Sequence, residues 1–349
     1  MSASPPPAAT TVLVTGASGF IAQHVILCLL EAGYRVRGTL RSLGRADEVR
    51  AVVAAHAGDP GDRLELVAAD LMKDDGWAEA VRGCRHVLHV ASPLPSRPPR
   101  HEDEVIVPAR DGALRVLAAA VAARVERVVL TSSVAAVLYG HARDGGRTYD
   151  ERDWSQLTDQ VGAYEKSKTI AERAAWDYVE ALPAEKRIEL CTINPGLVLG
   201  PVLAADFSTS GEVVRKLMRR DMPGCPDVGW APVDVRDVAS AHLAAMVTPE
   251  AAGQRFVVAI EHASMLDIAA ILDRRFRDRG YKVPTRRIPA WLLRLVSVWD
   301  RTARLAVQEL GKRQDLSTAR ARDVLGFQPR SLEQMVVDMA ESMIAHGVV

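Results

Sequence analysis

Tyr164 and Lys168 form the pair in this sequence best suited to proton transfer. At a spacing of four residues, two side chains share one face of a helix, so the ammonium group can lie beside the phenol. A free phenol has a pKa near 10, and lowering it to roughly 7 requires about 4 kcal/mol. A nearby cation is suited to supply much of that energy. The pair therefore predicts acid–base chemistry at the start of a helix.

A glycine-rich turn is the second chemical signal. It follows a short β-rich run directly and opens an apolar helix, which is the context of a dinucleotide site. Gly16 permits a tight turn, Gly19 lets the backbone approach a pyrophosphate, and Ala22 replaces the third glycine of such turns. The helix N-terminus offers free N–H groups to the phosphates. The predicted cofactor contacts here are Gly16, Ser18, Gly19, Phe20 and Ile21.

Basic residues at the end of the second strand candidate favour a cofactor with a 2′-phosphate. An NAD site needs a carboxylate about 20 residues after the turn. This sequence offers Arg37, Arg41 and Ser42 there, and no acid before residue 47. Guanidinium groups hold phosphate with paired hydrogen bonds, so NADPH is the predicted cofactor. Arg41 is the better candidate, whereas Arg37 and Arg45 are equally compatible with solvated surface charges.

Further candidates follow the next strands of the predicted sheet. Asp70 follows the third strand candidate, where its carboxylate can accept a bond from an adenine amino group or cap a helix. Ligands of open α/β sheets bind outside the carboxyl ends of the strands. The remaining predicted cofactor contacts at these ends are Asp70, Leu71, Val90, Ala91, Ser92 and Thr131.

Strand and helix signals alternate through the first two-thirds of the chain. This rhythm predicts an α/β fold, a Rossmann-type doubly wound parallel sheet, with a smaller C-terminal substrate-binding lobe. The predicted organisation is a disordered tail at 1–10, an NADP-binding domain at 11–200 joined again by 233–260, and a lobe at 201–232 and 261–349. Strands are expected at 11–15, 34–40, 64–68, 85–90, 127–130, 188–193 and 255–260, and helices at 21–30, 105–123, 163–181, 264–280 and 289–310.

Composition excludes several classes of protein. The 349 residues carry 44 Lys and Arg against 44 Asp and Glu, so a nucleic-acid partner is not expected. Four cysteines lie far apart without a CxxC pair, which predicts reduced thiols and no metal site. No apolar run reaches the roughly 18 residues of a membrane span. We expect a cytoplasmic monomer or homodimer.

An apolar face is expected on the helix at 289–310. Its members are Trp291, Leu292, Leu295, Val296, Val298 and Trp299. The main expectation is a helix packed within the lobe. A dimer contact and a peripheral membrane contact remain as alternatives.

The motifs together resemble a known family. The order TGASGFIA, ADL, HVASP, TSS, YEKSK, NPGLVLGP and DVLGFQPR is similar to that of the extended short-chain dehydrogenase/reductases. Within them, the sequence resembles most the branch of dihydroflavonol reductase, cinnamoyl-CoA reductase and yeast-type methylglyoxal/aldehyde reductases. The resemblance runs from about residue 11 to the end of the chain.

The resemblance implies a catalytic triad of Ser133, Tyr164 and Lys168. Tyr164 would protonate a carbonyl oxygen as hydride arrives from NADPH, and Ser133 would hydrogen-bond the same oxygen. Lys168 would lower the pKa of Tyr164 and bind the nicotinamide ribose. The remaining cofactor contacts that the resemblance implies are Pro195, Gly196, Leu197, Val198 and Ser210.

The sequence departs from flavonoid reductases in the predicted substrate pocket. Leu138 stands where those enzymes have an Asn, and Ala231 appears where they have a Gln. Catechol hydroxyls left unpaired there would cost about 1–3 kcal/mol each, which disfavours polyhydroxylated flavonoids. An apolar aliphatic or aromatic aldehyde or ketone is the predicted substrate. The expected pocket residues are Pro93, Leu94, Ser133, Leu138, Val198, Trp230 and Ala231.

The leading prediction is an NADPH-dependent carbonyl reductase. A nucleotide-sugar epimerase or dehydratase shares the triad, but it usually has an acid at the end of the second strand. A 3β-hydroxysteroid-type dehydrogenase would favour NAD. A non-catalytic NADP(H) sensor remains as the last alternative, although such sensors typically lose the tyrosine.

Overall fold

The computed structural model describes residues 7–93, 99, 101–141, 146–205, 207, 209–299 and 301–349. Of residues 301–303 and 305 it describes the backbone alone. Part of the predicted tail is structured: Pro7–Ala9 form a 3-10 helix (η1), and Thr10 is buried. Thr10 donates its N–H to the carbonyl of Pro7, and its own carbonyl accepts the N–H of Arg35. Residues 7–10, which were predicted to belong to the disordered tail, are therefore structured.

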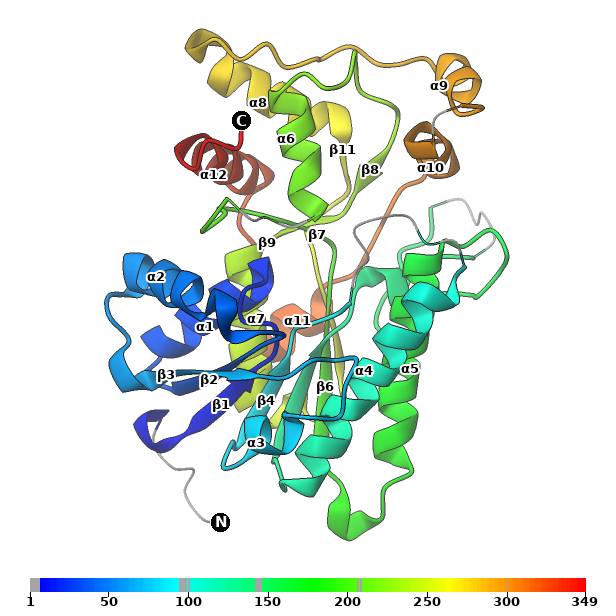
Figure 1. Cartoon of the computed structure of the whole chain (residues 1–349). Coiled ribbons are helices and arrows are strands. Elements are labelled where there is room, and N and C mark those ends of the chain that lie inside the picture. Colours follow the sequence, from blue (N-terminus) through cyan, green and yellow to red (C-terminus); the bar gives the residue numbers. More distant parts are fainter. Residues whose placement is uncertain are drawn as a thin grey trace.

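A seven-stranded parallel sheet forms the centre of the molecule, as predicted (Figure 1). The strand order turns around between β1 and β4, so this point of the sheet is its topological switch point. From one edge to the other the strands are β10 (Arg255–Val258), β6 (Glu189–Pro195), β5 (Arg127–Thr131), β4 (His86–His89), β1 (Thr11–Val14), β2 (Arg35–Leu40) and β3 (Leu64–Ala68).

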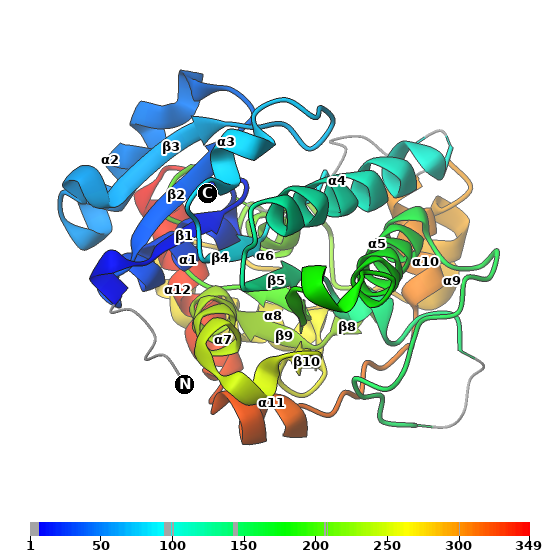
Figure 2. The same cartoon turned by 90° about the horizontal axis from the view of Figure 1, so that it is seen from below.

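Helices cover both faces of this sheet, and Figure 2 shows the two layers from below. The buried strands are rich in Val, Leu and Ile, as expected where both faces are covered. On one face lie α1 (Phe20–Glu31), α2 (Ala46–Ala57) and α7 (Val235–Val247). On the other lie α3 (Trp77–Val81), α4 (Asp103–Ala122) and α5 (Ala163–Glu180).

The lobe lies above the carboxyl ends of the strands (Figure 1). Its buried side chains form one cluster with those of the α1–α7 face, so Val14 and Met343 belong to the same core. A separate cluster fills the α3–α5 face. The lobe contains the pairs β7 (Leu197–Leu199) with β9 (Pro232–Asp234) and β8 (Gly229–Trp230) with β11 (Ala263–Ser264), and the helices α6 (Glu212–Met218), α8 (Met265–Phe276), α9 (Ala290–Val296), α10 (Arg301–Glu309) and α12 (Leu332–Ala345).

Short 3-10 helices connect many of these elements. They are η2 (Leu43–Arg45), η3 (Gly61–Arg63), η4 (Val134–Ala136), η5 (Ala184–Lys186), η6 (Thr209–Gly211), η7 (Pro249–Ala251) and η8 (Arg277–Arg279).

Two C-terminal regions differ from expectation. The predicted lobe at 261–349 includes α11 (Ala319–Leu325), which instead packs against α7 and β10 at the sheet. The single helix expected at 289–310 is divided into α9 and α10. Arg304 of α10 donates to the carbonyls of Ser297 and Val298, so its guanidinium satisfies backbone groups just after the end of α9.

The apolar face predicted on these residues does not pack within the lobe. Trp291 is 67% exposed and Trp299 is 78% exposed, whereas Leu293 is the buried member of α9. Division of the helix changes which side chains share a face, so the periodicity assumed for one long helix fails there. None of the helices in the described residues is long and apolar enough to cross a bilayer.

Candidate active site

The glycine-rich turn lies between the ends of β1, β2 and β4. Gly16 has φ +71°, and a Cβ there would lie 2.9 Å from the Cβ of Ala91. The Gly16 N–H donates to Oγ1 of Thr39 (3.1 Å), and the Ala17 N–H donates to the Thr39 carbonyl (2.8 Å). The Ala91 N–H donates to Oγ1 of Thr15 (2.9 Å). Only glycine fits at position 16, and buried Thr39 holds the turn in place.

Helix α1 begins directly after this turn. Its N-cap is exposed Gly19, which has no side chain to accept hydrogen bonds from the first amides of the helix. Phe20 is 8% exposed and packs edge-on against His24, so only its backbone faces the turn. Ala22 is buried, and its methyl fits the helix–sheet contact as expected. The uncapped N-terminus suits a pyrophosphate, so this part of the chain fits a dinucleotide.

Arg37 does not belong to the cofactor site. Its Nε donates to Glu65 across the β2–β3 pair (2.7 Å), and its Nη1 donates to the carbonyls of Ala80 (3.1 Å) and Arg82 (2.6 Å). Its side chain is 17% exposed. The sequence analysis allowed Arg37 to be either a ligand of the 2′-phosphate or a solvated surface charge. In the structure its guanidinium is instead bound to protein groups. Arg37 closes the carboxyl end of α3, because last-turn carbonyls need donors.

Arg41 and Arg45 both follow the end of β2. Arg41 is exposed, and Nη1 of Arg45 reaches Oγ of Ser18 in the turn (3.4 Å). Glu48 holds the Arg45 guanidinium through two bonds of 2.8 and 2.7 Å. The Ser42 hydroxyl accepts from Gly44 N–H and caps η2. The structure therefore places the guanidinium of Arg45 beside Ser18, and the role of Arg41 in holding a 2′-phosphate stays a prediction.

Asp70 and Leu71 were predicted to contact the adenine ring of the cofactor, and they differ in their burial and contacts. One carboxylate oxygen of Asp70 accepts the Met72 N–H (3.0 Å), which leaves the other oxygen for a ligand. Leu71 is 9% exposed, and a Cβ added at Gly112 of α4 would lie 3.2 Å from its Cβ. Its side chain belongs to the core under α4, so it is poorly placed to pack on an adenine ring.

A small cavity brings the candidates at the ends of β4 and β5 together. Its lining includes His89, Ala91, Ser92, Thr131, Ser132 and Lys168. Thr131 is buried and shares a hydrogen bond of 2.6 Å with Nε2 of His242. Val90 and Pro93 flank this lining in sequence and are half-buried, and Leu94 lies outside the described residues.

The Ser133 hydroxyl lies near the Tyr164 phenol, where it acts to lower the pKa of that group. Ser133 is 8% exposed, and its Oγ also accepts the Ala135 N–H (3.1 Å) at the start of η4. That amide occupies one lone pair of Oγ, so the Ser133 proton is free to point toward Tyr164. Tyr164 lies in the first turn of α5 and is 39% exposed. Part of the Tyr164 residue is therefore exposed, beside a buried serine.

Lys168 lies one turn further along α5. Its Nζ is 6.0 Å from the centroid of the Tyr164 ring. Desolvation lowers the pKa of Lys168 to about 8, and the charge of Glu172 opposes this decrease. Desolvation raises the pKa of Tyr164, and the nearby Ser133 hydroxyl opposes this increase. The decrease in the pKa of Tyr164 expected from Lys168 is not found in this structure, so Tyr164 is a protonated group near neutrality.

Sequence reasoning missed a buried polar network behind these residues. Glu172 is 1% exposed and accepts hydrogen bonds from Ser132, Thr192 (3.1 Å) and Asn194 (2.7 Å). Arg255 of β10 donates to the same carboxylate (2.6 Å). Glu172 is four residues after Lys168, but this spacing alone did not distinguish it from an exposed helical glutamate.

Residues 195–198, which were predicted as cofactor contacts, form the junction where β6 ends and β7 begins. The Gly196 N–H donates to the Val258 carbonyl (3.2 Å), and the Leu197 N–H donates to the Ala231 carbonyl (2.9 Å). A Cβ on Gly196 would lie 1.8 Å from that carbonyl oxygen, so only glycine fits. Buried Pro195 and Val198 flank this junction.

Ala231 contributes its backbone carbonyl to this junction. Its side chain is fully buried, which contradicts its predicted place in the pocket lining. Its N–H donates to Oε1 of Gln314 (3.0 Å), and Nε2 of Gln314 donates to the Tyr139 hydroxyl (3.1 Å). The resemblance to flavonoid reductases had suggested that this chain lacks a side-chain amide at position 231. Gln314, from a distant segment, brings such an amide to Ala231. No local signal around residue 314 could have shown this.

The remaining substrate candidates lie on separate elements. Leu138 follows η4, is half-buried and packs against the cluster of Val134, Val137 and Tyr149. Trp230 is half-buried on β8, where it pairs with Ala263. Ser210, the loosest cofactor candidate, lies in η6, which packs against β7.

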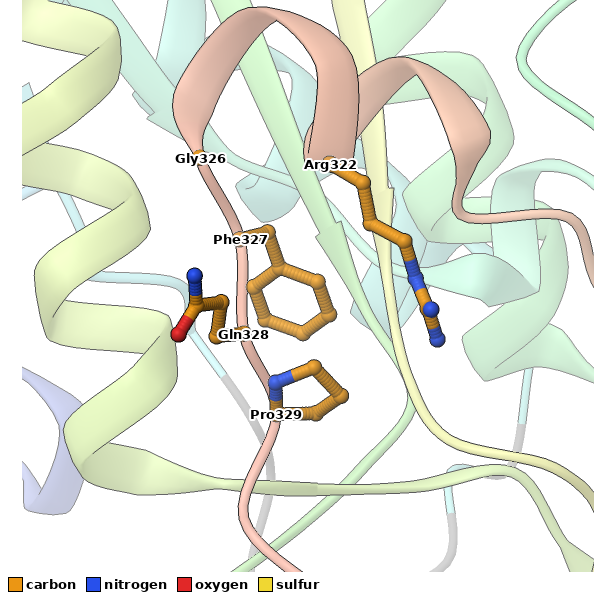
Figure 3. A pocket seen from close by; sticks show the side chains of 5 residues that line it. All are labelled: Arg322, Gly326, Phe327, Gln328 and Pro329. Atoms are coloured by element: carbon orange, nitrogen blue, oxygen red, sulfur yellow. The ribbon is translucent and has the colours of Figure 1, made fainter.

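Another pocket lies at the end of α11, far along the chain from these motifs (Figure 3). Its labelled side chains come from the single segment from Arg322 to Pro329, and Arg322 Nε is engaged by the Thr318 hydroxyl (3.2 Å). Within the part of the chain that the structure describes, no cluster of His, Cys, Asp or Glu is arranged to hold a metal ion.

Comparison with known proteins places this chain in a family. The model of the NAD dependent epimerase/dehydratase family matches residues 12–259. Cinnamoyl-CoA reductase 1 of Arabidopsis thaliana is 36% identical over 283 residues, which are 80% of this chain and 78% of the relative. The NADPH-dependent methylglyoxal reductase of Saccharomyces cerevisiae is 32% identical over 354 residues, covering 96% of this chain and 98% of the relative.

Solved structures agree with the sequence relatives. The crystal structure of yeast methylglyoxal/isovaleraldehyde reductase complexed with NADPH aligns with a TM-score of 0.79 at 29% identity, covering 97% of this chain and all of that one. Vestitone reductase from alfalfa aligns with a TM-score of 0.72 at 25% identity, covering 97% and 99% of the two chains. This chain belongs to the NAD dependent epimerase/dehydratase family, the extended short-chain dehydrogenase/reductases, and is an oxidoreductase of that family.

Proposed function

We propose that this protein is an NADPH-dependent reductase of an apolar aldehyde or ketone. The observation that carries the proposal is that Tyr164 lies beside the Ser133 hydroxyl, with Nζ of Lys168 6.0 Å from the centroid of its ring. The Gly16–Gly19 turn fits a pyrophosphate, and Arg41 with Arg45 suits a 2′-phosphate. The similar proteins named above as reductases, one of them bound to NADPH, support the same assignment.

Each residue of the triad has one task in the reduction. NADPH, when bound, supplies the hydride to the carbonyl carbon. Tyr164 donates its phenolic proton to the carbonyl oxygen, since its raised pKa keeps the proton in place until negative charge develops there. The Ser133 hydroxyl hydrogen-bonds the same oxygen. The ammonium of Lys168 stabilises the tyrosinate that remains, which then regains a proton from water.

The pocket favours substrates with few polar groups. Leu138 and Trp230 present apolar side chains, and the amide of Gln314 is already engaged by Ala231 and Tyr139. A catechol would find few free partners on these residues, which disfavours polyhydroxylated substrates. We expect aromatic and branched aliphatic carbonyl compounds to be reduced best.

The test is cofactor oxidation by the purified chain across a panel of aromatic and aliphatic aldehydes and ketones. Each substrate is assayed with NADPH and with NADH, and a polyhydroxylated flavonoid serves as the polar comparison. Turnover that prefers NADPH and the apolar carbonyls supports the proposal. Tight NADPH binding without turnover of any carbonyl, together with conversion of a nucleotide sugar, would overturn it.

A further inference from the structure

Glu172 is buried among groups that belong to the proposed site, although it does not reach the reacting atoms. Its side chain, on the buried face of α5, is fully buried. One carboxylate oxygen accepts from the Ser132 hydroxyl and the Asn194 amide, and the other accepts from Thr192 and Arg255. A buried carboxylate requires this number of donors. The number and variety of partners set Glu172 apart from the exposed Glu180 of the same helix.

The network continues from Glu172 to the backbone of Ser133. Asn194 donates from Nδ2 to the Ser133 carbonyl (3.2 Å) as well as to Glu172. The Ser132 N–H donates to the Ile193 carbonyl on β6 (2.8 Å). The segment that presents the Ser133 hydroxyl is therefore tied to α5 and β6. Tyr164 also lies on α5. The contacts of Glu172 therefore link the segment that carries the Ser133 hydroxyl to the helix that carries the Tyr164 hydroxyl.

Glu172 also lies close to Lys168. Both residues line the cavity at the ends of β4 and β5. The titratable groups that face Lys168 are Tyr164 and Glu172 on its own helix and His89 from β4, whereas α4 presents Ala109 and Ala113 to the cavity. Burial lowers the pKa of His89 to about 3, so His89 carries no charge near neutrality. Glu172 is then the anion that faces the ammonium.

Arg255 completes the network from the edge strand β10. Its Nη1 donates to the carbonyls of Glu151 (2.8 Å) and Asp153 (2.7 Å), and its guanidinium lies 3.7 Å from the centroid of the Trp154 ring. These contacts fix the guanidinium against Glu172. The pair offers two substitutions that break the same ion pair but remove opposite charges.

We propose that Glu172 is a positioning residue of the reduction: its carboxylate holds the Ser133 segment against α5 and keeps Lys168 in its ammonium form. This inference rests on the proposed function, because it assigns Lys168 the task of stabilising the Tyr164 phenolate. Neither effect requires Glu172 to touch the substrate or the cofactor.

The experiment compares Glu172→Gln with Arg255→Gln in the full chain, with Glu180→Gln as the matched control on the exposed face of α5. The readout is the dependence of kcat on pH, with saturating NADPH and a carbonyl that the wild-type enzyme reduces. Both variants of the ion pair should reduce kcat about tenfold by loosening the Ser133 segment. Glu172→Gln should also move the alkaline decline in kcat to lower pH, because Lys168 loses the anion that favours its charged form.

Arg255→Gln should leave the alkaline decline in place or move it to higher pH, since the carboxylate remains. Glu180→Gln should match the wild-type enzyme. Superimposable profiles for Glu172→Gln and Arg255→Gln would overturn the inference, because a purely structural role predicts the same profile for both. If Glu172→Gln does not fold, the double variant Glu172→Gln/Arg255→Gln, which leaves no unpaired buried charge, gives the same comparison. Absence of turnover in the wild-type enzyme would count against the proposed function instead.

Discussion

Two walls of the candidate site are built in different ways. The catalytic wall, formed by Ser133, Tyr164 and Lys168, is supported by side chains that are themselves buried and hydrogen-bonded, with Glu172 at the centre. The lobe wall is the proposed substrate side, formed by Trp230 with the buried Ala231 and Gln314 behind it, and it is supported by backbone pairing and one bridging amide. A buried carboxylate that accepts hydrogen bonds from several elements restricts the positions that those elements can take. A wall bridged by one side chain has fewer constraints on its shape.

The difference suggests a division of work between the two walls. Proton transfer requires hydroxyls held in fixed positions, and the buried network ties the Ser133 segment to the helix that carries Tyr164. Substrate choice requires a surface that can vary without disturbing that hydroxyl. The lobe wall meets this need, because its residues come from segments that share no helix or strand with the triad.

The largest effect is expected from Tyr164→Phe, which removes the proton donor and leaves the ring. We expect kcat to fall about 10³-fold while the affinity for NADPH changes little, since general acid catalysis typically contributes factors of this order. Steady-state rates and a cofactor titration measure both quantities. Tyr178→Phe on the same helix is the matched control and should retain activity. Full activity in Tyr164→Phe would show that the catalytic wall has been assigned to the wrong residue.

Arg41→Ala should have the next largest effect, by weakening the binding of NADPH but not of NADH. Loss of a charge-assisted hydrogen bond to phosphate costs about 1.5–3 kcal/mol, or roughly 10- to 100-fold in KM for NADPH. Arg37→Met is the matched control, because Arg37 is bound to Glu65 and to α3 carbonyls. It should reduce the melting temperature without changing the ratio of NADPH to NADH activity. An equal decrease in that ratio for both variants would contradict the division between Arg37 and Arg41.

Gln314→Ala tests the lobe wall. The change leaves the Ala231 N–H and the Tyr139 hydroxyl without their partner. Burial raises the pKa of Tyr139, so its hydroxyl stays protonated and needs a new acceptor or donor nearby. We expect KM for the carbonyl to change by up to about tenfold, with kcat nearly unchanged. Gln334→Ala, at an exposed position of α12, is the control. A loss in kcat as large as that of Tyr164→Phe would mean that the two walls are not separable.

The smallest effect on activity at neutral pH is expected from the buried histidines. They make the free energy of unfolding depend on pH. Burial lowers the pKa of His24, His86 and His242 to about 4, and of His89 to about 3, against 6.5 in the unfolded chain. Below pH 6.5 the unfolded chain therefore binds protons that the native state does not, and the free energy of unfolding falls as the pH decreases toward 4.

Urea denaturation at pH 7 and at pH 5 measures this effect. We expect a lower free energy of unfolding at pH 5, and a smaller difference between the two pH values in His24→Gln than in the wild-type protein. All four histidines lie in the sheet and its helices, so the effect belongs to the half that carries the catalytic wall. Equal stability at the two pH values would contradict the burial of these rings as neutral groups.

Much of the cofactor half could be predicted because its signals are local. The turn at Gly16 and the strand and helix around it depend on residues close in sequence, and the strand at 64–68 was predicted with the bounds it has. Arg37 was misassigned for the opposite reason. Whether an arginine on β2 meets a phosphate or the end of α3 depends on which face of the strand it occupies and on what packs there.

By itself, the sequence determined the alternating fold, the dinucleotide turn and the Tyr164–Lys168 pair, because periodicity and fixed spacing carry these features within one or two elements. Only the tertiary structure decided which buried groups support them. Glu172 gains its partners from β6 and β10, and Gln314 reaches Ala231 across 83 residues. Such contacts join segments whose order along the chain says nothing about their distance in space, so packing alone brings them together.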